Sequence, residues 1–283
     1  MPADLSQLVP WLDVGSAKRI PGGWTSETHE VSGWIVQVAR SSYATNTLRH
    51  QLRVLPKLAV HLGARIPRPQ LACDGPVTMV YRKLDGASVE VDLPGAWPEQ
   101  LGAFLARLHT LGPRSLGLEA IDADTLREDR RIDCQRLFAA VAPHLSGGER
   151  LRAELLLADL LDDDRCWKMT PVVRHGDLGP EHVLASPAGD LAAVIDWEDV
   201  GAGDPADDFA WWLHAWPAVG ERMLAAYGGP PDEKFRQRAR VLHAIMPWHD
   251  VEHGTATDDG ALIAAGLDAT RARLEEGAVR RAP

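Results

Sequence analysis

The sequence predicts an α+β protein, with a small β-rich N-terminal lobe followed by a larger, mainly helical lobe. Two observations carry this prediction. Apolar residues alternate with period two in parts of the first lobe, and helical spacing dominates from Trp97 onward. The chain of 283 residues is long enough to bury a core in each lobe. We place the lobes at residues 1–88 and 89–283.

The N-terminal lobe is expected to hold strands and one helix. The segment HEVSGWIVQVAR alternates around Trp34, Val36 and Val38, which is typical of a half-buried strand. The segment PVTMVYRKLDG predicts another strand. Between them a helix is predicted that ends at Gly63, because leucines recur there at helical spacing. These are Leu48, Leu52, Leu55, Leu58 and Leu62.

The second lobe is predicted to be mostly helical. The segment PEQLGAFLARLHTLG begins with Pro98 in a first helical turn and ends at Gly112. Residues 150–162 predict another helix, and helices are expected to fill most of the chain to about residue 277. Short strands are expected around Val172 and Val194.

Composition narrows the class of protein. The chain has no run of 18 apolar residues and no signal-like N-terminus, so we expect a cytoplasmic protein with no membrane partner. Three cysteines far apart in sequence argue against a disulfide framework and are expected to be small core residues. No basic stripe is available to neutralise phosphates along a strand, so a nucleic-acid partner is not expected.

Charge is distributed unevenly along the chain. Residues 1–91 hold ten Lys or Arg against seven Asp or Glu, although the whole chain has a net charge of −10. From His175 to Glu221, with both ends included, there are ten acidic residues and no Lys or Arg. A solvated acidic face explains such a run, but the asymmetry also suits an anion near the first lobe and a cation near the second.

The segment from Val172 to Asp208 carries the chemistry. HGDL places Asp177 in a tight turn, and VIDW places Asp196 at the end of an apolar strand nineteen residues later. Two carboxylates on neighbouring loops can divide the work of phosphoryl transfer, because the protein mainly positions groups and neutralises charge. Mg²⁺ binds through one or two carboxylates plus substrate phosphates. Asp177 therefore suits the base or positioning role, and Asp196 suits metal binding.

These motifs, with GDPADDFAWW after them, resemble the aminoglycoside phosphotransferase family, the antibiotic kinases with a protein-kinase-like fold. IVQVARSSYATNTLRHQLRVL, MVYRKLDG and LGAFLARLHTLG extend the resemblance over most of residues 20–215. The resemblance implies a bilobal kinase fold and Mg²⁺ as cofactor. It also implies that Asp177 is the catalytic aspartate, that Asp196 and position 182 hold metal, and that His175 supports the catalytic loop.

Position 182 departs from the family pattern. It is His182 where the family usually has Asn, and Mg²⁺ prefers oxygen ligands to imidazole. The change is interpreted either as damage to the second metal site or as an adaptation. Adaptation is favoured, because the macrolide and 2″-aminoglycoside branches, which are active kinases, also have His there.

The usual Lys–Glu pair of the first lobe is also replaced. Our alignment puts Gln37 and Gln51 in these positions, so that neither charge is left unpaired. Arg40 is then the nearest cation for the phosphates, unless the lysine position has been misplaced.

A third departure concerns the nucleotide loop GGWTSET, which is not G-x-G-x-x-G. Ser26 and nearby backbone N–H groups could cradle phosphate there, although an ordinary β-turn explains the segment equally well. Tyr81 would be a bulky gatekeeper, with the backbone from Arg82 to Leu84 contacting the base. By resemblance a large gatekeeper goes with GTP, so GTP is slightly favoured over ATP as donor.

The acidic and aromatic residues of the second lobe suit a cationic acceptor. Tryptophans at helical spacing are interpreted as core residues or as the wall of a cation pocket. Asp204 and Asp208 are expected to anchor loops instead. The candidate substrate-binding residues are Glu198, Asp199, Trp212, Asp250 and Glu252.

The sequence therefore predicts an antibiotic O-phosphotransferase, a monomer or weak dimer, that uses a nucleoside triphosphate as donor. Candidate acceptors are an aminoglycoside, a basic peptide of the capreomycin or viomycin type, and a macrolide. Two alternatives stay open: a small-metabolite kinase of the choline or homoserine type, and a pseudokinase that binds nucleotide or ligand without transfer.

Overall fold

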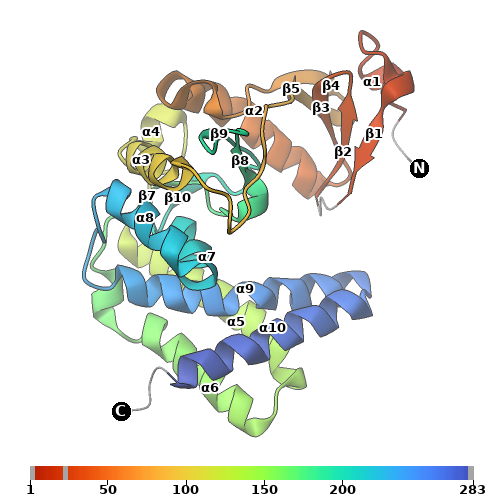
Figure 1. Cartoon of the computed structure of the whole chain (residues 1–283). Helices are drawn as coiled ribbons and strands as arrows, with labels where there is room; N and C mark the ends of the chain where they lie inside the picture. Colours follow the sequence, from red (N-terminus) through yellow and green to blue (C-terminus); the bar gives the residue numbers. More distant parts are fainter. Residues whose placement is uncertain (1–3, 22–24, 280–283) are drawn as a thin grey trace. The chain divides into compact units, whose positions relative to one another are not determined.

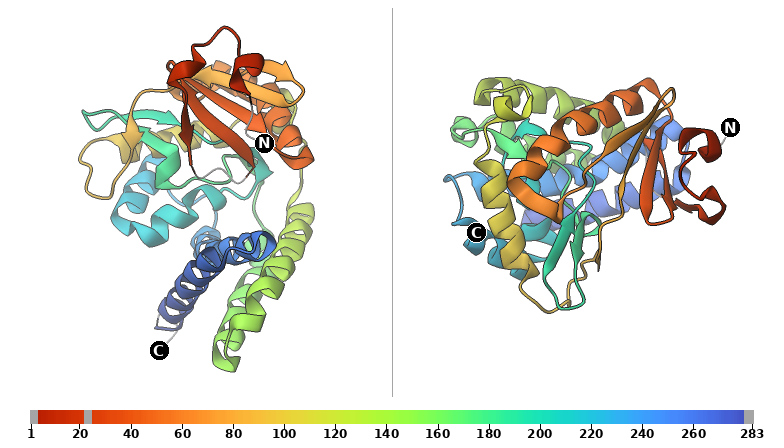
Figure 2. Two further views of the ribbon diagram at one scale, coloured as in Figure 1. Left: turned by 90° about the vertical axis from the view of Figure 1, so that its right-hand side faces the viewer. Right: turned by 90° about the horizontal axis from the view of Figure 1, so that it is seen from above.

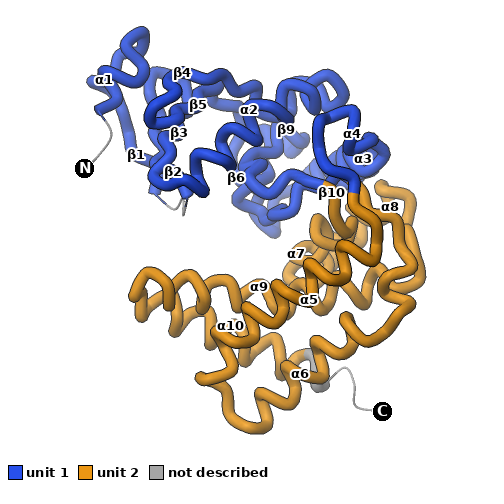
Figure 3. Tube along the Cα trace, turned by 180° about the vertical axis from the view of Figure 1, so that it is seen from behind, with its two compact units in different colours: residues 1–120, 173–201 blue, residues 121–172, 202–283 orange. Residues whose placement is uncertain are grey.

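The computed structural model describes residues 4–21 and 25–279. Its contacts divide the chain into two compact units, each built from two stretches of sequence (Figure 3). The first unit comprises Met1–Ala120 and Val173–Gly201, and the second comprises Ile121–Val172 and Ala202–Pro283. These units do not follow the predicted lobes, because the segment after residue 88 joins the first unit as far as Ala120. The lobe boundary at residue 88 stays a prediction.

The first unit begins with a five-stranded antiparallel sheet of order β1-β2-β3-β5-β4 (Figure 1). Its strands are β1 (Lys18–Ile20), β2 (Ser26–Val31), β3 (Trp34–Ala39), β4 (Gln70–Asp74) and β5 (Val77–Arg82). The predicted alternation around Val36 corresponds to β3. In the central strands Gln37 lies opposite both Thr28 and Met79, so these three side chains share one face.

Each face of this sheet packs against a different helix (Figure 2). The helix α1 (Leu5–Leu8) covers the face formed by Val31, Val36, Val38 and Val80. The helix α2 (Ser42–Leu62) contributes Leu48 to a cluster with Met79 on the other face. Ser41 caps α2 by accepting a hydrogen bond from the Ala44 N–H group, and Gly63 ends it as predicted.

The rest of the first unit combines two helices with a small sheet. The helices are α3 (Trp97–His109) and α4 (Pro113–Leu116). The sheet has the order β6-β8-β9, with β6 (Ala87–Ser88), β8 (Val183–Ala185) and β9 (Leu191–Val194). Two short strands, β7 (Val172–Arg174) and β10 (Gly201–Gly203), lie where the chain passes between the units.

The second unit is helical. Its helices are α5 (Ala123–Val141), α6 (Gly147–Leu161), α7 (Asp207–Ala215), α8 (Pro217–Tyr227), α9 (Phe235–Thr257) and α10 (Gly260–Val279). The long helices α9 and α10 run side by side (Figures 1 and 2). Trp248, Leu160 and Cys134 belong to the core between α5, α6 and α9. A capping box of Ser146 and Glu149 fixes the start of α6.

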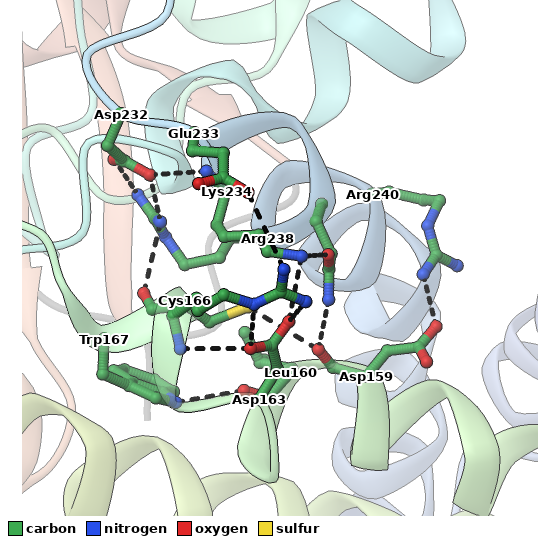
Figure 4. Close-up of polar contacts among 12 residues, drawn as sticks. Asp159, Leu160, Asp163, Cys166, Trp167, Asp232, Glu233, Lys234, Arg238 and Arg240 are labelled. Atoms are coloured by element: carbon green, nitrogen blue, oxygen red, sulfur yellow. Dashed lines mark hydrogen bonds and ion pairs between the residues drawn. The ribbon is translucent and has the colours of Figure 1, made fainter.

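One buried arginine ties three segments of the second unit together. Arg238 of α9 is fully buried and donates to both carboxylate oxygens of Asp204, at 2.7 and 3.1 Å. It also donates twice to Asp232 at 2.8 Å and once to the carbonyl of Cys166 at 3.2 Å (Figure 4). Asp204 in addition accepts from the Ala206 N–H group, which agrees with a loop-anchoring role.

Two of the three cysteines are core residues, as expected from composition. Cys134 and Cys166 are fully buried, as expected for small core residues, whereas Cys73 is partly exposed. Among the described residues, every helix is too short or too polar to cross a membrane.

Candidate active site

The candidate catalytic turn follows β7 and depends on a glycine. Gly176 has a φ of +95°, which favours glycine, and an added Cβ atom would lie 2.7 Å from the carbonyl oxygen of Asp199. At Gly176 the backbone after β7 therefore lies so close to the loop after β9 that a residue with a Cβ atom would not fit. This approach places Asp177 beside the loop that carries Asp196.

His175 is buried beneath this turn and connects the two loops. Its Nε2 atom donates to the carbonyl of Ile195 at 2.9 Å, and its Nδ1 atom accepts from the Asp177 N–H group at 3.3 Å. Because a carbonyl can only accept and an N–H can only donate, the ring is neutral with its proton on Nε2. His175 has no exposed surface, so it positions Asp177 and does not face a substrate.

The three predicted catalytic and metal residues lie together. His182 is in a short 3-10 turn and donates from Nδ1 to the carbonyl of Asp177 at 2.7 Å. Its Nε2 atom lies 3.4 Å from Oδ2 of Asp196, and its Nδ1 atom lies 3.7 Å from Oδ2 of Asp177. When the ring is neutral, its one proton is on Nδ1, because this atom donates to the Asp177 carbonyl. The Nε2 atom then has a lone pair on the side of the Asp196 carboxylate.

The charges of this group influence one another. Burial raises the pKa of Asp177 to about 6, with Asp199 and Asp196 acting in the same direction and His182 against them. Burial also opposes the charged form of His182, but Asp196 and Asp177 outweigh it and raise the pKa of the imidazole. Asp177 therefore combines a carboxylate that is ionised at neutral pH with an increased affinity for a proton.

Asp196 is held in an unusual backbone conformation. Its φ is +61°, in the left-handed region, which is uncommon for a residue other than glycine and tends to occur at functional sites. The next residue, Trp197, is fully buried and donates from Nε1 to the carbonyl of Val194 at 2.9 Å. Its ring packs 4.6 Å from that of His175. The buried indole of Trp197 thus packs against His175 of the Asp177 turn and is hydrogen-bonded to the end of the strand that precedes Asp196.

A family model described as the phosphotransferase enzyme family matches residues 16–240. The chain belongs to the phosphotransferase enzyme family. A similar protein is the viomycin phosphotransferase of Streptomyces vinaceus, 31% identical over 94% of this chain and 96% of that protein.

Two solved structures of phosphotransferases are also similar. One is the GDP complex of wild-type aminoglycoside 2′-phosphotransferase-IIIa, with a TM-score of 0.81, 20% identity, and coverage of 96% of this chain and 97% of that one. The other is the macrolide 2′-phosphotransferase MphH of Brachybacterium faecium, with a TM-score of 0.73, 24% identity, and coverage of 95% and 98%. The predicted α+β, kinase-like fold class is confirmed.

The strand face next to α2 carries the predicted nucleotide residues of this phosphotransferase. Tyr81 lies opposite Ile35 on the strand β5, and Ser26 is buried at the start of β2. Burial raises the pKa of Tyr81, and the charges of Asp196 and Glu198 add to this effect. The strands therefore put the predicted gatekeeper within the electrostatic reach of the candidate metal residue. Gly22, Gly23 and Trp24 of the predicted loop lie outside the described residues.

Gln37 and Gln51 each have one buried amide atom without a hydrogen-bond partner in the described part of the chain. Oε1 of Gln37 and Nε2 of Gln51 are both buried, and neither has a hydrogen-bond partner within the described chain. Buried polar atoms are rarely left in this state, so such atoms call for an explanation such as a ligand or water. The predicted replacement of the Lys–Glu pair agrees with this environment and stays a prediction.

The other predicted nucleotide residues lie away from Gln37 or at the surface. Successive side chains of a strand alternate between faces, so Arg40 falls on the opposite face from Gln37 and lies 3.7 Å from Glu27. The structure therefore does not bring Arg40 beside Gln37. Arg82 is exposed and stacks 4.2 Å above the ring of Trp34, and Leu84 is partly exposed.

The predicted substrate residues fall in both units. In the first unit, Glu198 accepts a hydrogen bond from the Thr25 hydroxyl at 2.7 Å, and burial raises its pKa to about 7. The carbonyl of Asp199 accepts from Arg174 at 3.4 Å. Thr25 was missed from the sequence, although it stands in the quoted GGWTSET segment.

In the second unit, Trp212 is fully buried, which favours its interpretation as a core residue over a substrate contact. Glu252 forms an ion pair with Arg136, and burial raises the pKa of Asp250. The roles of these three residues in binding a substrate stay predictions.

Proposed function

We propose that this protein is an antibiotic O-phosphotransferase. It transfers the γ-phosphoryl group of a nucleoside triphosphate to a hydroxyl group of a cationic antibiotic. The observation that carries the proposal is the convergence of Asp177, His182 and Asp196, with His182 hydrogen-bonded to one loop and facing the carboxylate of the other. Membership of the phosphotransferase enzyme family supports it.

Asp177 is the group that orients and deprotonates the acceptor hydroxyl. The hydroxyl oxygen forms a bond to the γ-phosphorus, the bond from that phosphorus to the leaving diphosphate breaks, and the hydroxyl proton passes to the carboxylate. A pKa of about 6 suits this role, because the carboxylate is mostly ionised at neutral pH and still accepts a proton more readily than an ordinary aspartate. His175 and Gly176 hold the carboxylate in place through the contacts described above.

Asp196 and His182 are the residues that would hold Mg²⁺, which neutralises charge on the transferred phosphates when bound. The donor set fits, because the Nε2 lone pair of a neutral His182 and Oδ2 of Asp196 face each other at 3.4 Å. Among the described residues, no group of three or more His, Cys, Asp or Glu side chains gathers into a metal cage. Mg²⁺ usually keeps several waters and phosphate oxygens as ligands, so two protein ligands are enough.

The nucleotide is proposed to lie along the α2-facing side of the strands, past Ser26, Gln37 and Tyr81, with its base against the backbone from Arg82 to Leu84. We favour GTP over ATP, since Tyr81 is bulky and the similar aminoglycoside 2′-phosphotransferase-IIIa was solved with GDP. The buried amide atoms of Gln37 and Gln51 are candidates for hydrogen bonds to the nucleotide or its water.

A basic cyclic peptide of the viomycin type is the first candidate acceptor. The supporting observation is the 31% identity to viomycin phosphotransferase, which extends over nearly the whole of both chains. Aminoglycosides and macrolides are the next candidate acceptors. Glu198, Asp199, Asp250 and Glu252 are the proposed acidic contacts for the cationic groups of the acceptor.

A transfer assay tests the proposal. The purified protein is incubated with Mg·GTP or Mg·ATP and, in separate reactions, with viomycin, capreomycin, kanamycin, a macrolide, choline and homoserine. Nucleoside diphosphate release and a mass gain of one phosphoryl group in the acceptor are the readouts. We expect the wild type to transfer a phosphoryl group to an antibiotic. This transfer should be lost in the Asp177→Asn variant and kept in Asp190→Asn, a matched substitution at an exposed position of the same segment. Transfer to choline or homoserine alone, or nucleotide binding without any transfer, would refute it.

A further inference from the structure

His50 of helix α2 makes a hydrogen bond to the loop that carries the candidate metal ligand Asp196. His50 lies in the middle of α2, and its Nε2 atom is 2.8 Å from the carbonyl oxygen of Val200. The two residues are 150 positions apart in sequence and both belong to the first unit. Val200 is buried and stands four residues after Asp196, so the contact reaches the far end of the loop that begins with this aspartate.

The hydrogen bond has a fixed direction. A carbonyl oxygen can only accept, so the Nε2 atom of His50 carries a proton. The Nδ1 atom accepts from Nη2 of Arg53, one helical turn further on, at 3.0 Å. Both ring nitrogens of a neutral His50 are therefore used, and Arg53 selects the tautomer that donates to Val200.

Gln51, the neighbour of His50, does not provide a second connection of this kind. Its Nε2 atom is buried and has no hydrogen-bond partner among the residues that the structure describes. Gln37 of β3 and Gln51 of α2 are both uncharged, so these two residues cannot form an ion pair between the strand and the helix. Among the residues that the structure describes, the hydrogen bond from His50 to Val200 therefore connects the centre of α2 to the loop.

The loop needs such support, because its first residue is in a conformation that is unfavourable for aspartate. Asp196 has a φ of +61°, and left-handed residues other than glycine persist only where the surroundings hold them. Thr25 fixes the middle of the loop through Glu198, and the N–H group of Val200 closes a turn to the carbonyl of Trp197 at 3.4 Å. His50 fixes the end of this turn.

We propose that His50 is a positioning residue for the metal site: it holds the Asp196–Val200 loop against α2 through its hydrogen bond to the Val200 carbonyl. This inference rests on the proposed function, since it assigns Asp196 to the metal that accompanies the nucleotide. Partners that hydrogen-bond a metal ligand directly typically change metal affinity or activity about 10- to 100-fold when they are replaced. His50 acts one step further out, through Val200, so we expect a change near the lower end of this range.

The test compares two substitutions of His50. In His50→Gln, the side-chain amide nitrogen is separated from Cα by as many bonds as Nε2 of histidine, so the donor is kept. In His50→Leu, the donor is lost while an apolar side chain of similar bulk remains. His61→Leu, at an exposed position near the end of the same helix, is the matched control. Thermal unfolding and circular dichroism establish that each variant is folded.

The readout is the affinity for GDP measured by calorimetry with and without Mg²⁺, because it does not depend on identifying the acceptor. We expect Mg·GDP to bind about tenfold or more weakly to His50→Leu and nearly normally to His50→Gln and His61→Leu. GDP without metal is expected to bind all four proteins, the wild type included, alike. Arg53→Leu, a second variant for the case that His50→Leu does not fold, should weaken Mg·GDP in the same direction.

Three results would overturn the inference: unchanged Mg·GDP binding by the folded His50→Leu and Arg53→Leu variants, an equal loss in His50→Gln and His50→Leu, or a loss that is the same without metal. These results are distinct from a failure of the proposed function. In that case the wild type would bind Mg·GDP and transfer nothing to any antibiotic, and the comparison of the His50 variants would still stand.

Discussion

Replacing Arg238 by methionine removes the cation that two carboxylates of the second unit share. Arg238 has no exposed surface, and the Asp204 side chain is only 4% exposed, so water cannot take over the lost hydrogen bonds. Burial opposes the charge on Arg238, but the hydrogen bonds to Asp232 and the charge of Asp204 outweigh it and raise the pKa of the guanidinium. The guanidinium is therefore charged, and the substitution leaves the buried Asp204 carboxyl without its cation.

Breaking a buried ion pair from one side destabilises a protein by about 3–5 kcal/mol, because the remaining charge stays desolvated. We expect this loss in the free energy of unfolding of Arg238→Met. The matched control is Arg236→Met on the same helix. Arg236 donates to Glu221 at 2.7 Å, but both side chains are about half exposed, and such pairs contribute about 0.2–1 kcal/mol.

The assay is urea unfolding followed by circular dichroism and tryptophan fluorescence, at several pH values. Burial raises the pKa of the Asp204 carboxyl above its unfolded value of about 3.9 although the charge of Arg238 opposes the rise, so removing Arg238 raises this pKa further. Asp204 in the folded variant then binds its proton more tightly than in the unfolded chain, so the contribution of this one group to stability is most favourable at low pH and is lost as the pH rises. The deficit relative to the wild type should therefore be smaller near pH 4 than at pH 7. A deficit no larger than that of Arg236→Met, or one that grows toward low pH, would refute the reasoning.

Three further predictions concern the turn, a helix cap and the metal ligand. Gly176→Ala should lower the free energy of unfolding by more than about 2 kcal/mol and reduce transfer, because its φ is positive and an added Cβ atom would contact the Asp199 carbonyl. Gly148→Ala in the helix α6 should instead raise the free energy of unfolding by about 0.5–1 kcal/mol. Thermal melts compare the two variants. Ser146→Ala should cost about 1 kcal/mol by removing the cap of α6, and an unchanged urea midpoint would contradict this. Asp196→Asn should raise the Mg²⁺ concentration needed for half-maximal transfer at least about tenfold, as a metal titration of the rate would show.

The sequence was informative where one local pattern determines the structure. The alternation around Val36 and the leucine repeat of α2 correspond to buried faces, and both elements appear where they were predicted. The grouping of Asp177, His182 and Asp196 was also predictable, because short strands put their ends at neighbouring loops. The kinase-like fold class followed from the family motifs.

Other features depend on contacts between distant segments, and local patterns do not contain them. Arg40 was assigned to phosphate because it is close to Gln37 in sequence; its side chain lies 3.7 Å from Glu27, a contact that the local pattern does not contain, and the phosphate role stays a prediction. The hydrogen bonds of Thr25 and His50 join residues 173 and 150 positions apart, so no spacing could indicate them. For Trp212, helical spacing favoured a core position over a pocket, and its complete burial supports the core interpretation.

The interleaved order of the two units has a consequence for synthesis. Residues 173–201, which hold the whole candidate catalytic group, complete a unit that begins at the N-terminus, but 52 residues of the other unit, Ile121–Val172, are translated between these two parts. A nascent chain that has passed Ala120 therefore has a sheet and α2 without the strands β8 and β9, and Val200 is not yet there for His50 to bind. Because domains tend to fold as they leave the ribosome, the N-terminal part of the first unit stays incomplete until residues 173–201 are synthesised, and the surface that they cover is exposed in the meantime. Slow translation between Ile121 and Val172 would prolong this exposed state, and rapid translation would shorten it.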